Sequence, residues 1–160
     1  QGICGSGLID LLAELRRHHM MTEKGVFTHD RKAKKISILP EHDITFSRED
    51  ASNLAQAKAA NYCGQVLVTR ALGVPIHQID NLYLAGGFVN YIDIESAIEI
   101  GFLPPLSEQR IIKIGNASLQ GCREVLLSIS KRMALEELVT KIDHIENTCL
   151  CTMIYNSPTD

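Results

Sequence analysis

The sequence predicts an α/β fold, because segments of strand character alternate with segments of helical periodicity. Two strand-turn-helix units carry this prediction. Residues 81–85 form an apolar strand that leads through a glycine pair to a helix at 92–99, and residues 111–114 form a second strand that leads through 115–118 to another helix. The composition, 45% hydrophobic and 22% charged over 160 residues, fits one globular domain or one lobe of a larger one.

The chain begins with a glycine-rich turn, residues 2–7, that leads into a helix. Apolar residues recur at helical spacing from Leu8 to Leu15. Ser6 is the expected N-cap, which leaves the amides behind it free at the positive end of the helix dipole. Short β-favouring runs then follow, separated by charged or proline-containing turns. These runs are residues 26–28, 36–39 and 44–46.

The longest predicted element is a helix over residues 48–72. Ser47, with Asp50 three residues later, is typical of a capping box at its start. Small residues four apart line one face, so another element can pack closely there, and Lys58 projects beside that face. With a helix at 117–132, this helix is expected to flank a mixed sheet. The small residues are Ala51, Ala55, Ala59 and Cys63.

The C-terminal part is predicted to contain a last helix at 135–142 and an extended, weakly patterned tail at 143–160. Five dispersed cysteines favour a reducing, cytoplasmic location over a disulfide framework. Cys149 and Cys151 are the single close pair, and a cluster or zinc shell usually needs four ligands, so we expect free thiols there. Because the chain starts with Gln1 inside a motif, we expect a piece of a longer protein.

Charge and hydropathy argue against two classes of partner. Sixteen Lys and Arg nearly balance 19 Asp and Glu, and the basic cluster at 31–35 contains no aromatic residue, so nucleic acid is not expected. No apolar stretch reaches the roughly 18 residues that cross a bilayer. The six histidines lack the spacing of a zinc site. The sequence therefore predicts no metal ligands and identifies no catalytic residue.

Three glycine-bearing turns at predicted helix starts are the candidates for ligand binding. Glycines let a ligand lie against the backbone, and a helix N-terminus offers free amides, which suits a phosphate or a base edge. A tight structural turn is the alternative for each, and neither a Gly-x-Gly-x-x-Gly after a strand nor a Walker motif is present. The turns comprise Gly5, Ser6 and Gly7, then Gly86, Gly87 and Phe88, then Gly115 and Asn116.

Five short motifs follow one another in a fixed order. They are GICGSGLID at 2–10, AKAA at 57–60, LAGGF at 84–88, IGFLP at 100–104 and GNASLQG at 115–121. This ordered set resembles the C-terminal domain of the reductive activators of corrinoid proteins, members of the actin-like ATPase superfamily with its ribonuclease-H-like fold. The resemblance covers residues 1–142, which we therefore expect to be the C-terminal lobe of an actin-like ATPase domain.

The resemblance implies an ATP-dependent redox helper. Such activators pass an electron from a ferredoxin-like iron–sulfur domain of the same polypeptide to the inactive cobalt(II) form of a corrinoid protein in a methyl-transfer system, which restores cobalt(I). ATP and magnesium would bind the intact parent, and the iron–sulfur cluster would lie in a separate domain. We expect the fragment alone to be inactive and leave its oligomeric state open, a homodimer included.

The resemblance also implies roles for individual residues. In the superfamily a Gly-Gly turn after a buried strand holds the adenosine side of the nucleotide, which implies Gly86 and Gly87 here, with Phe88 beside them. Lys58 resembles a clamp lysine over the adenine and ribose, and Asn116 takes the position of a polar contact to the nucleotide. Together with the turn at residues 5–7, these residues form the expected cofactor site.

Two departures and two alternatives accompany this hypothesis. Val89 stands where the family usually has a further glycine, and Ala55 stands where chaperone relatives carry an acid. One alternative is the lobe of a small-molecule kinase of the same superfamily. The other is a non-enzymatic interaction module in which the glycine turns are structural and the face of small residues serves dimerisation.

Overall fold

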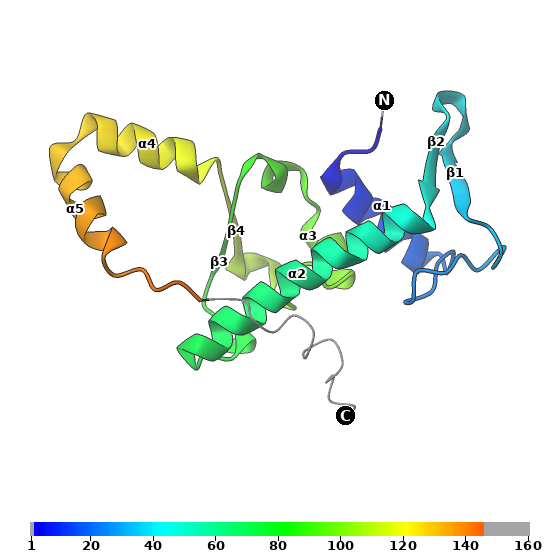
Figure 1. The fold of residues 1–160 in the computed structure, drawn as a ribbon, viewed down its shortest axis with the longest axis horizontal. Helices are drawn as coiled ribbons and strands as arrows, with labels where there is room; N and C mark the ends of the chain where they lie inside the picture. The colour runs from blue at the N-terminus through cyan, green and yellow to red at the C-terminus, as the bar shows by residue number, and fades with distance from the viewer. Residues whose placement is uncertain (1, 146–160) are drawn as a thin grey trace.

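The structure is a computed structural model that describes residues 2–145, and it confirms the predicted α/β class (Figure 1). The predicted tail at 143–160 falls mostly outside these residues, as do Cys149 and Cys151. Short 3-10 turns, among them η2 (Ile76–Gln78) and η3 (Gly87–Tyr91), connect the larger elements. These are α1 (Gly5–Arg17), β1 (Lys35–Leu39), β2 (Ile44–Ser47), α2 (Arg48–Leu72), β3 (Leu82–Ala85), α3 (Ile94–Glu99), β4 (Ile111–Gly115), α4 (Ala117–Leu127) and α5 (Ile129–Val139).

The strands form two small sheets in place of the single mixed sheet that we expected. β1 and β2 are an antiparallel pair with Ile36 opposite Phe46, and β3 and β4 are a parallel pair with Tyr83 opposite Ile112. The run at 26–28 contributes only an isolated bridge between residues 21 and 27. Each pair packs on its own apolar cluster, the β1–β2 pair beside the start of α2 and the β3–β4 pair beside α3 (Figure 1).

Two apolar clusters form the core, and α1 contributes to both because apolar residues lie on more than one of its faces. The larger cluster joins α1 to α3 and the β3–β4 pair. It contains Ile9, Ala13, Val89, Ile92, Ala97, Ile100, Leu103, Leu106 and Ile111. The smaller cluster holds the β1–β2 hairpin and the start of α2, and it contains Leu15, Met21, Phe27, Phe46 and Ala51.

The first helix begins two residues earlier than a Ser6 cap would place its start, so that prediction is wrong. Cys4 is the N-cap, with extended backbone and no capping side chain, and its carbonyl accepts a hydrogen bond from the Leu8 amide at 3.0 Å. Ser6 lies inside the first turn and is buried, with its hydroxyl 3.2 Å from the Cys4 sulfur. Burial against the core has replaced the solvent-exposed cap that the local sequence favours.

The capping box at the start of α2 is confirmed. The Ser47 hydroxyl accepts a hydrogen bond from the Asp50 amide at 3.0 Å, and the Asp50 carboxylate accepts one from the Ser47 amide at 2.8 Å. Hydrogen bonds from the Ser47 side chain and backbone lower the pKa of Asp50. Because a lowered pKa favours the charged form, the stabilisation is complete above the ordinary aspartate pKa and is lost as the pH falls from there through the lower pKa of the folded state.

Removal of this cap gives a first test of the fold. Ser47→Ala should lower the free energy of unfolding by about 1 kcal/mol. The Asp50 amide loses its hydrogen-bond acceptor, and the Asp50 carboxylate, which accepts from the Ser47 amide, loses the hydroxyl that helps to position it. Ser52→Ala, in the same helix at an exposed position, is the control and should change it by less than about 0.5 kcal/mol. Urea unfolding measures both, and equal effects would exclude a specific role for the cap.

The predicted helix at 117–132 is divided, which corrects that boundary. α4 ends at Leu127, Ser128 is extended with φ −143°, and α5 begins at Ile129. The Ser128 hydroxyl accepts a hydrogen bond from the Lys131 amide at 3.3 Å, so serine acts as an N-cap where apolar periodicity alone predicted continuity. The two helices form a hairpin that projects from the β3–β4 pair (Figure 1).

Candidate functional site

The parallel strands bring two of the predicted turns side by side. Ala85 pairs with Gly115 in the ladder, and the Gly86 amide donates a hydrogen bond to the Gly115 carbonyl at 2.6 Å. Gly87 and Asn116 therefore follow two neighbouring strand ends. In open α/β sheets the crevice beyond the carboxyl ends of the strands is where ligands bind.

The turn at residues 5–7 meets this edge of the sheet through Phe88. A Cβ atom on Gly5 would lie 2.9 Å from Cε2 of Phe88, so only glycine lets the ring rest on the first turn of α1. Phe88 also meets Phe102 edge to face, with ring centroids 6.3 Å apart, yet it remains 41% exposed. The fold thus gathers all three glycine turns, predicted separately from the sequence, into one region.

The two glycines after β3 have different roles. Gly86 has φ +113°, a conformation that only glycine adopts readily, whereas Gly87 has no such restriction. A Cβ on Gly87 would meet no atom within 4 Å, so this residue leaves open surface against which a ligand can lie. Val89, where the family usually has a further glycine, is 8% exposed and belongs to the larger core cluster.

Asn116 serves the fold at this edge as well. Its side-chain oxygen accepts a hydrogen bond from the Leu119 amide at 3.0 Å, which makes it the N-cap of α4. The capping arrangement holds the side chain at the helix start, where the amide nitrogen makes no hydrogen bond within residues 2–145. Asn90, which the sequence did not single out, has its Oδ1 atom 3.8 Å from the position of a Cβ on Gly115.

Lys58 lies on α2 beside Gly101, the residue that precedes Phe102. Its Cε and Nζ atoms are 3.3 and 3.4 Å from the position of a Cβ on Gly101. Burial, and then the nearby charge of Arg16, lower the pKa of Lys58. Within the described part of the chain no carboxylate pairs with this ammonium group. The lysine is therefore an incompletely solvated cation without an anionic partner.

Phe102 is a residue that the sequence analysis did not place in the site. Its carbonyl accepts hydrogen bonds from Asn61 at 2.6 Å and Gln65 at 3.2 Å, so it fixes α2 against the segment after α3. Through its ring contact with Phe88, it connects the helix that carries Lys58 to the glycine turns. The aromatic after a glycine in the IGFLP motif was the available signal.

The remaining residues of the first turn serve mainly to shape it. A Cβ on Gly7 would lie 3.1 Å from the Ile3 side chain, so close packing accounts for this glycine. Cys4 is exposed, and hydrogen bonds from the Ser6 hydroxyl and then the Gly7 amide lower the pKa of its thiol. Within residues 5–7, Gly5 is the residue that links this turn to the Gly86-Gly87 turn, through its contact with the ring of Phe88.

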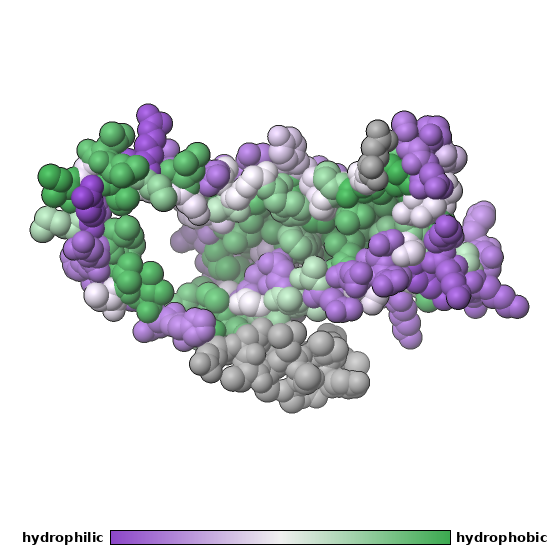
Figure 2. All heavy atoms as spheres, turned by 45° about the horizontal axis from the view of Figure 1, so that its top comes forward, coloured by the Kyte–Doolittle hydropathy of each residue, from purple (hydrophilic) through white to green (hydrophobic). Residues whose placement is uncertain are grey.

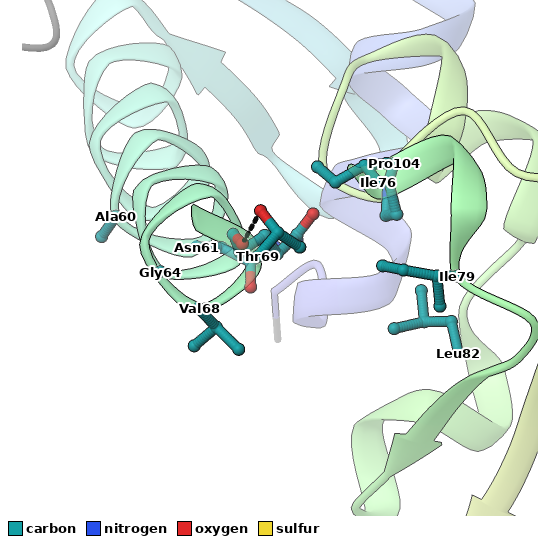
Figure 3. Close-up of a pocket in the computed structure, with 10 residues that line it drawn as sticks. Ala60, Asn61, Gly64, Val68, Thr69, Ile76, Ile79, Leu82 and Pro104 are labelled. Atoms are coloured by element: carbon teal, nitrogen blue, oxygen red, sulfur yellow. Dashed lines mark hydrogen bonds between the residues drawn. The ribbon is translucent and has the colours of Figure 1, made fainter. Parts of the chain in front are cut away.

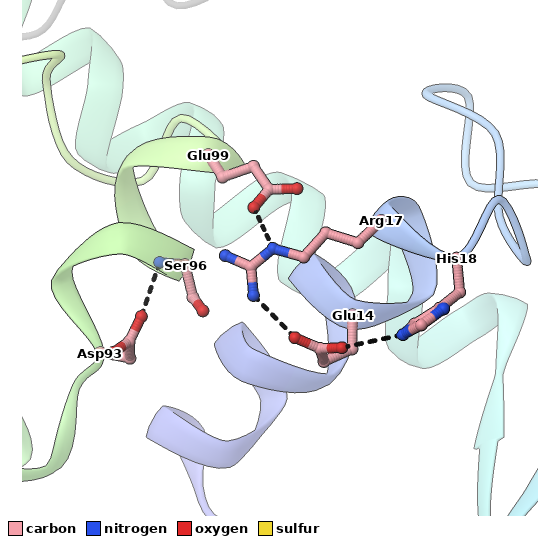
Figure 4. Close-up of polar contacts among 6 residues, drawn as sticks. All are labelled: Glu14, Arg17, His18, Asp93, Ser96 and Glu99. Atoms are coloured by element: carbon pink, nitrogen blue, oxygen red, sulfur yellow. Dashed lines mark hydrogen bonds and ion pairs between the residues drawn. The ribbon is translucent and has the colours of Figure 1, made fainter.

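Polar side chains at the interface of α1 and α3 include an ion pair that joins the two helices (Figure 4). Arg17 donates hydrogen bonds to Glu99 at 2.5 Å and to Glu14 at 2.7 Å, so one guanidinium ties the two helices together. Asp93 caps α3 by accepting a hydrogen bond from the Ser96 amide at 2.7 Å.

One carboxylate at this interface lacks a partner. The Oδ1 atom of Asp10, on α1, is buried and makes no hydrogen bond within residues 2–145. Burial first, and then the negative charge of Asp93, raise the pKa of Asp10. Among these residues no three His, Cys, Asp or Glu side chains are placed to hold a metal ion. In the same range no helix is long and apolar enough to span a membrane.

A separate hollow lies between α2 and the segment that leads into β3 (Figure 3). It has a volume of about 480 Å³ and a mostly apolar lining. Its walls come from the second half of α2 and from η2, so it is distinct from the glycine turns. The lining residues include Ala60, Gly64, Val68, Ile76, Ile79 and Leu82.

Comparison with known proteins identifies relatives for nearly the whole chain. A corrinoid activation enzyme, RamQ of Eubacterium limosum, is 30% identical over 168 residues, which cover 91% of this chain and 28% of that protein. A [Co(II) methylated amine-specific corrinoid protein] reductase of Methanosarcina barkeri is 24% identical over 164 residues, which cover 96% of this chain and 29% of that protein.

A solved structure shares the fold. It is a reductive activator for a corrinoid, iron–sulfur protein, which superposes with a TM-score of 0.79 at 31% identity and covers 92% of this chain but 26% of that one. The chain thus spans between a quarter and three tenths of the length of these relatives. The family model for the C-terminal domain of RACo, the ASKHA domain, matches residues 1–150. The chain belongs to this family and has its actin-like fold.

Proposed function

We propose that the intact protein is a cytoplasmic, ATP-dependent reductive activator of a corrinoid protein. The relatives support this proposal, because their names describe corrinoid activation or reduction of a cobalt(II) corrinoid protein. In the proposed reaction one electron passes from an iron–sulfur domain elsewhere in the polypeptide to cobalt(II), which gives the cobalt(I) needed for methyl transfer. ATP with magnesium supplies the free energy for this difficult reduction.

Residues 1–142 would form the lobe that carries the adenosine-side wall of the ATP site. The observation that carries this assignment is the convergence of three glycine turns beyond the carboxyl ends of β3 and β4. Gly87 would offer bare backbone to the nucleotide, and the exposed part of Phe88 an apolar surface. Asn116 would use its free amide nitrogen, and Lys58 its unpaired ammonium group, which gains most from an anionic ligand because it is partly desolvated.

The proposal is tested with the intact protein, purified without oxygen. A corrinoid protein in its cobalt(II) state, supplied with a low-potential electron donor, should lose its cobalt(II) absorbance only when the activator and magnesium-ATP are both present. ATP consumption with phosphorylation of a small molecule, and no change at cobalt, would favour the kinase alternative. Absence of any nucleotide binding by the folded protein would favour the interaction module.

Lys58 permits a separate test of the nucleotide site. Lys58→Met removes the charge and keeps most of the apolar stem that lies against Gly101, so we expect the Kd for ATP to rise at least threefold with the Tm within about two degrees. Lys24→Met, an exposed lysine in the loop after α1, is the control and should change neither quantity. Calorimetric titration and a thermal melt measure them. A lower Tm with unchanged ATP affinity would make Lys58 a structural residue.

A further inference from the structure

The two halves of the proposed nucleotide site come from different parts of the molecule. Lys58 lies on α2, whereas the glycine turns lie at the start of α1 and at the ends of β3 and β4. α2 extends from the hydrophilic end of the molecule, beside the β1–β2 hairpin, across its more apolar middle (Figure 2). The distance between Lys58 and the glycine turns therefore depends on how the middle of α2 is fixed to the rest of the fold.

A short turn after α3, formed by Gly101 and Phe102, makes this connection. Gly101 has φ +72°, and its amide donates a hydrogen bond to the Ile98 carbonyl at 2.8 Å, so it ends α3 in the left-handed conformation that favours glycine. The Phe102 carbonyl then accepts hydrogen bonds from α2, while the Phe102 ring meets Phe88 edge to face. One residue thus contacts α2 through its backbone and the glycine turns through its side chain.

Asn61 is the residue of α2 that holds this 101–102 turn most closely. Its side-chain nitrogen donates to the Phe102 carbonyl at 2.6 Å, whereas the Gln65 nitrogen is 3.2 Å from the same oxygen. Asn61 lies three residues after Lys58 on the helix, and the Lys58 Cε atom is 3.3 Å from the position of a Cβ on Gly101. Both side chains therefore lie against the same turn, which fixes α2 at the level of the lysine.

We propose that Asn61 is a positioning residue of the nucleotide site, and that its hydrogen bond to the Phe102 carbonyl sets the distance between the Lys58 ammonium group and the glycine turns. This role of Asn61 rests on the proposed function, because it takes effect only when a nucleotide bridges the lysine and the turns. Supporting hydrogen bonds hold the groups of a precise binding site to within about 0.5 Å. Lys58 needs such support, because it is partly desolvated and its attraction to an anion is weakly screened.

A double-mutant cycle in the intact protein tests whether Asn61 acts through Lys58. Asn61→Ala should raise the Kd for magnesium-ATP at least about threefold in the unsubstituted protein, but less than about 1.5-fold when Lys58→Met is already present. The position of α2 no longer matters for binding once the ammonium group is gone. Gln65→Ala, which removes the longer hydrogen bond to the same carbonyl, should show the same pattern with a smaller loss of affinity. Calorimetric titration gives each Kd.

Ser47→Ala is the matched control for stability. It also removes a hydrogen bond of α2, but at the start of the helix and away from the 101–102 turn. It should leave the Kd for ATP within about 1.5-fold although the Tm falls. A thermal melt of every variant confirms that each titration is made on folded protein.

The possible results separate this role of Asn61 from the nucleotide site itself. Unchanged ATP affinity in folded Asn61→Ala protein, or equal losses with and without Lys58→Met, would overturn the positioning role and leave the site in place. A threefold loss in Ser47→Ala would also overturn it, because general loosening of α2 would then explain the effect. Unchanged affinity in Lys58→Met would remove the lysine from the proposed site, and the role of Asn61 with it.

Discussion

Gly87→Val in the intact protein should weaken ATP binding at least tenfold, about 1.4 kcal/mol, while the folded state keeps its stability. The structure explains why this substitution should weaken ATP binding without lowering stability. A Cβ on Gly87 would meet no protein atom within 4 Å, and its backbone does not need the conformation that is reserved for glycine. The added methyl groups therefore intrude on the ligand and not on the fold, if the adenosine side of ATP lies against this turn.

Two further glycine variants turn this into a controlled experiment. Gly64→Val, on α2, also places its side chain in open space and should leave the ATP affinity unchanged. Gly86→Val should lower the Tm as well, because φ is +113° there. Calorimetric titration with magnesium-ATP, with a thermal melt of each variant, gives both quantities. Unchanged affinity in a well-folded Gly87→Val protein would remove the turn from the nucleotide site.

Local sequence patterns predicted the elements well where the determining interactions are local. The capping box of Ser47 and Asp50 and the 25 residues of α2 are set by neighbours in the sequence, and both are confirmed. The errors at Ser6 and Ser128 have different causes. Ser6 is buried inside the first turn of α1, so tertiary packing overrides its preference for a cap, whereas Ser128 caps α5 locally where apolar periodicity alone predicted one continuous helix.

The sequence predicted the three glycine turns of the candidate site but not that the fold brings them together. Glycines before helix starts mark three turns, but their proximity depends on the parallel pairing that places Gly86 beside Gly115 and on the ring of Phe88 over Gly5. Neither contact has a signature in a single sequence. The IGFLP motif contains Phe102, but the role of this residue was not predictable, because it rests on a carbonyl that accepts hydrogen bonds from α2.

A substitution in the smaller core cluster should lower the stability of the protein and leave ATP binding unchanged, which is the opposite of the result expected for Gly87→Val. Phe27 is 1% exposed and belongs to this cluster, which contains no residue of the glycine turns, so Phe27→Ala should lower the free energy of unfolding by about 3–5 kcal/mol through lost burial and the cavity left behind. Phe27→Leu retains much of the volume and should cost less than half of that. Urea unfolding with unchanged slope measures the loss.

The ATP affinity of this variant tests which of the two core clusters supports the nucleotide site. The Phe27 cluster holds the β1–β2 hairpin to α1 and to the start of α2, whereas the glycine turns rest on the larger cluster around Ile9 and Ile100. Under conditions where Phe27→Leu is folded, its Kd for ATP should therefore stay within about threefold of the parent value. A tenfold loss of affinity in that variant would mean that the hairpin end of the lobe, and with it the position of α2, controls the site that carries Lys58.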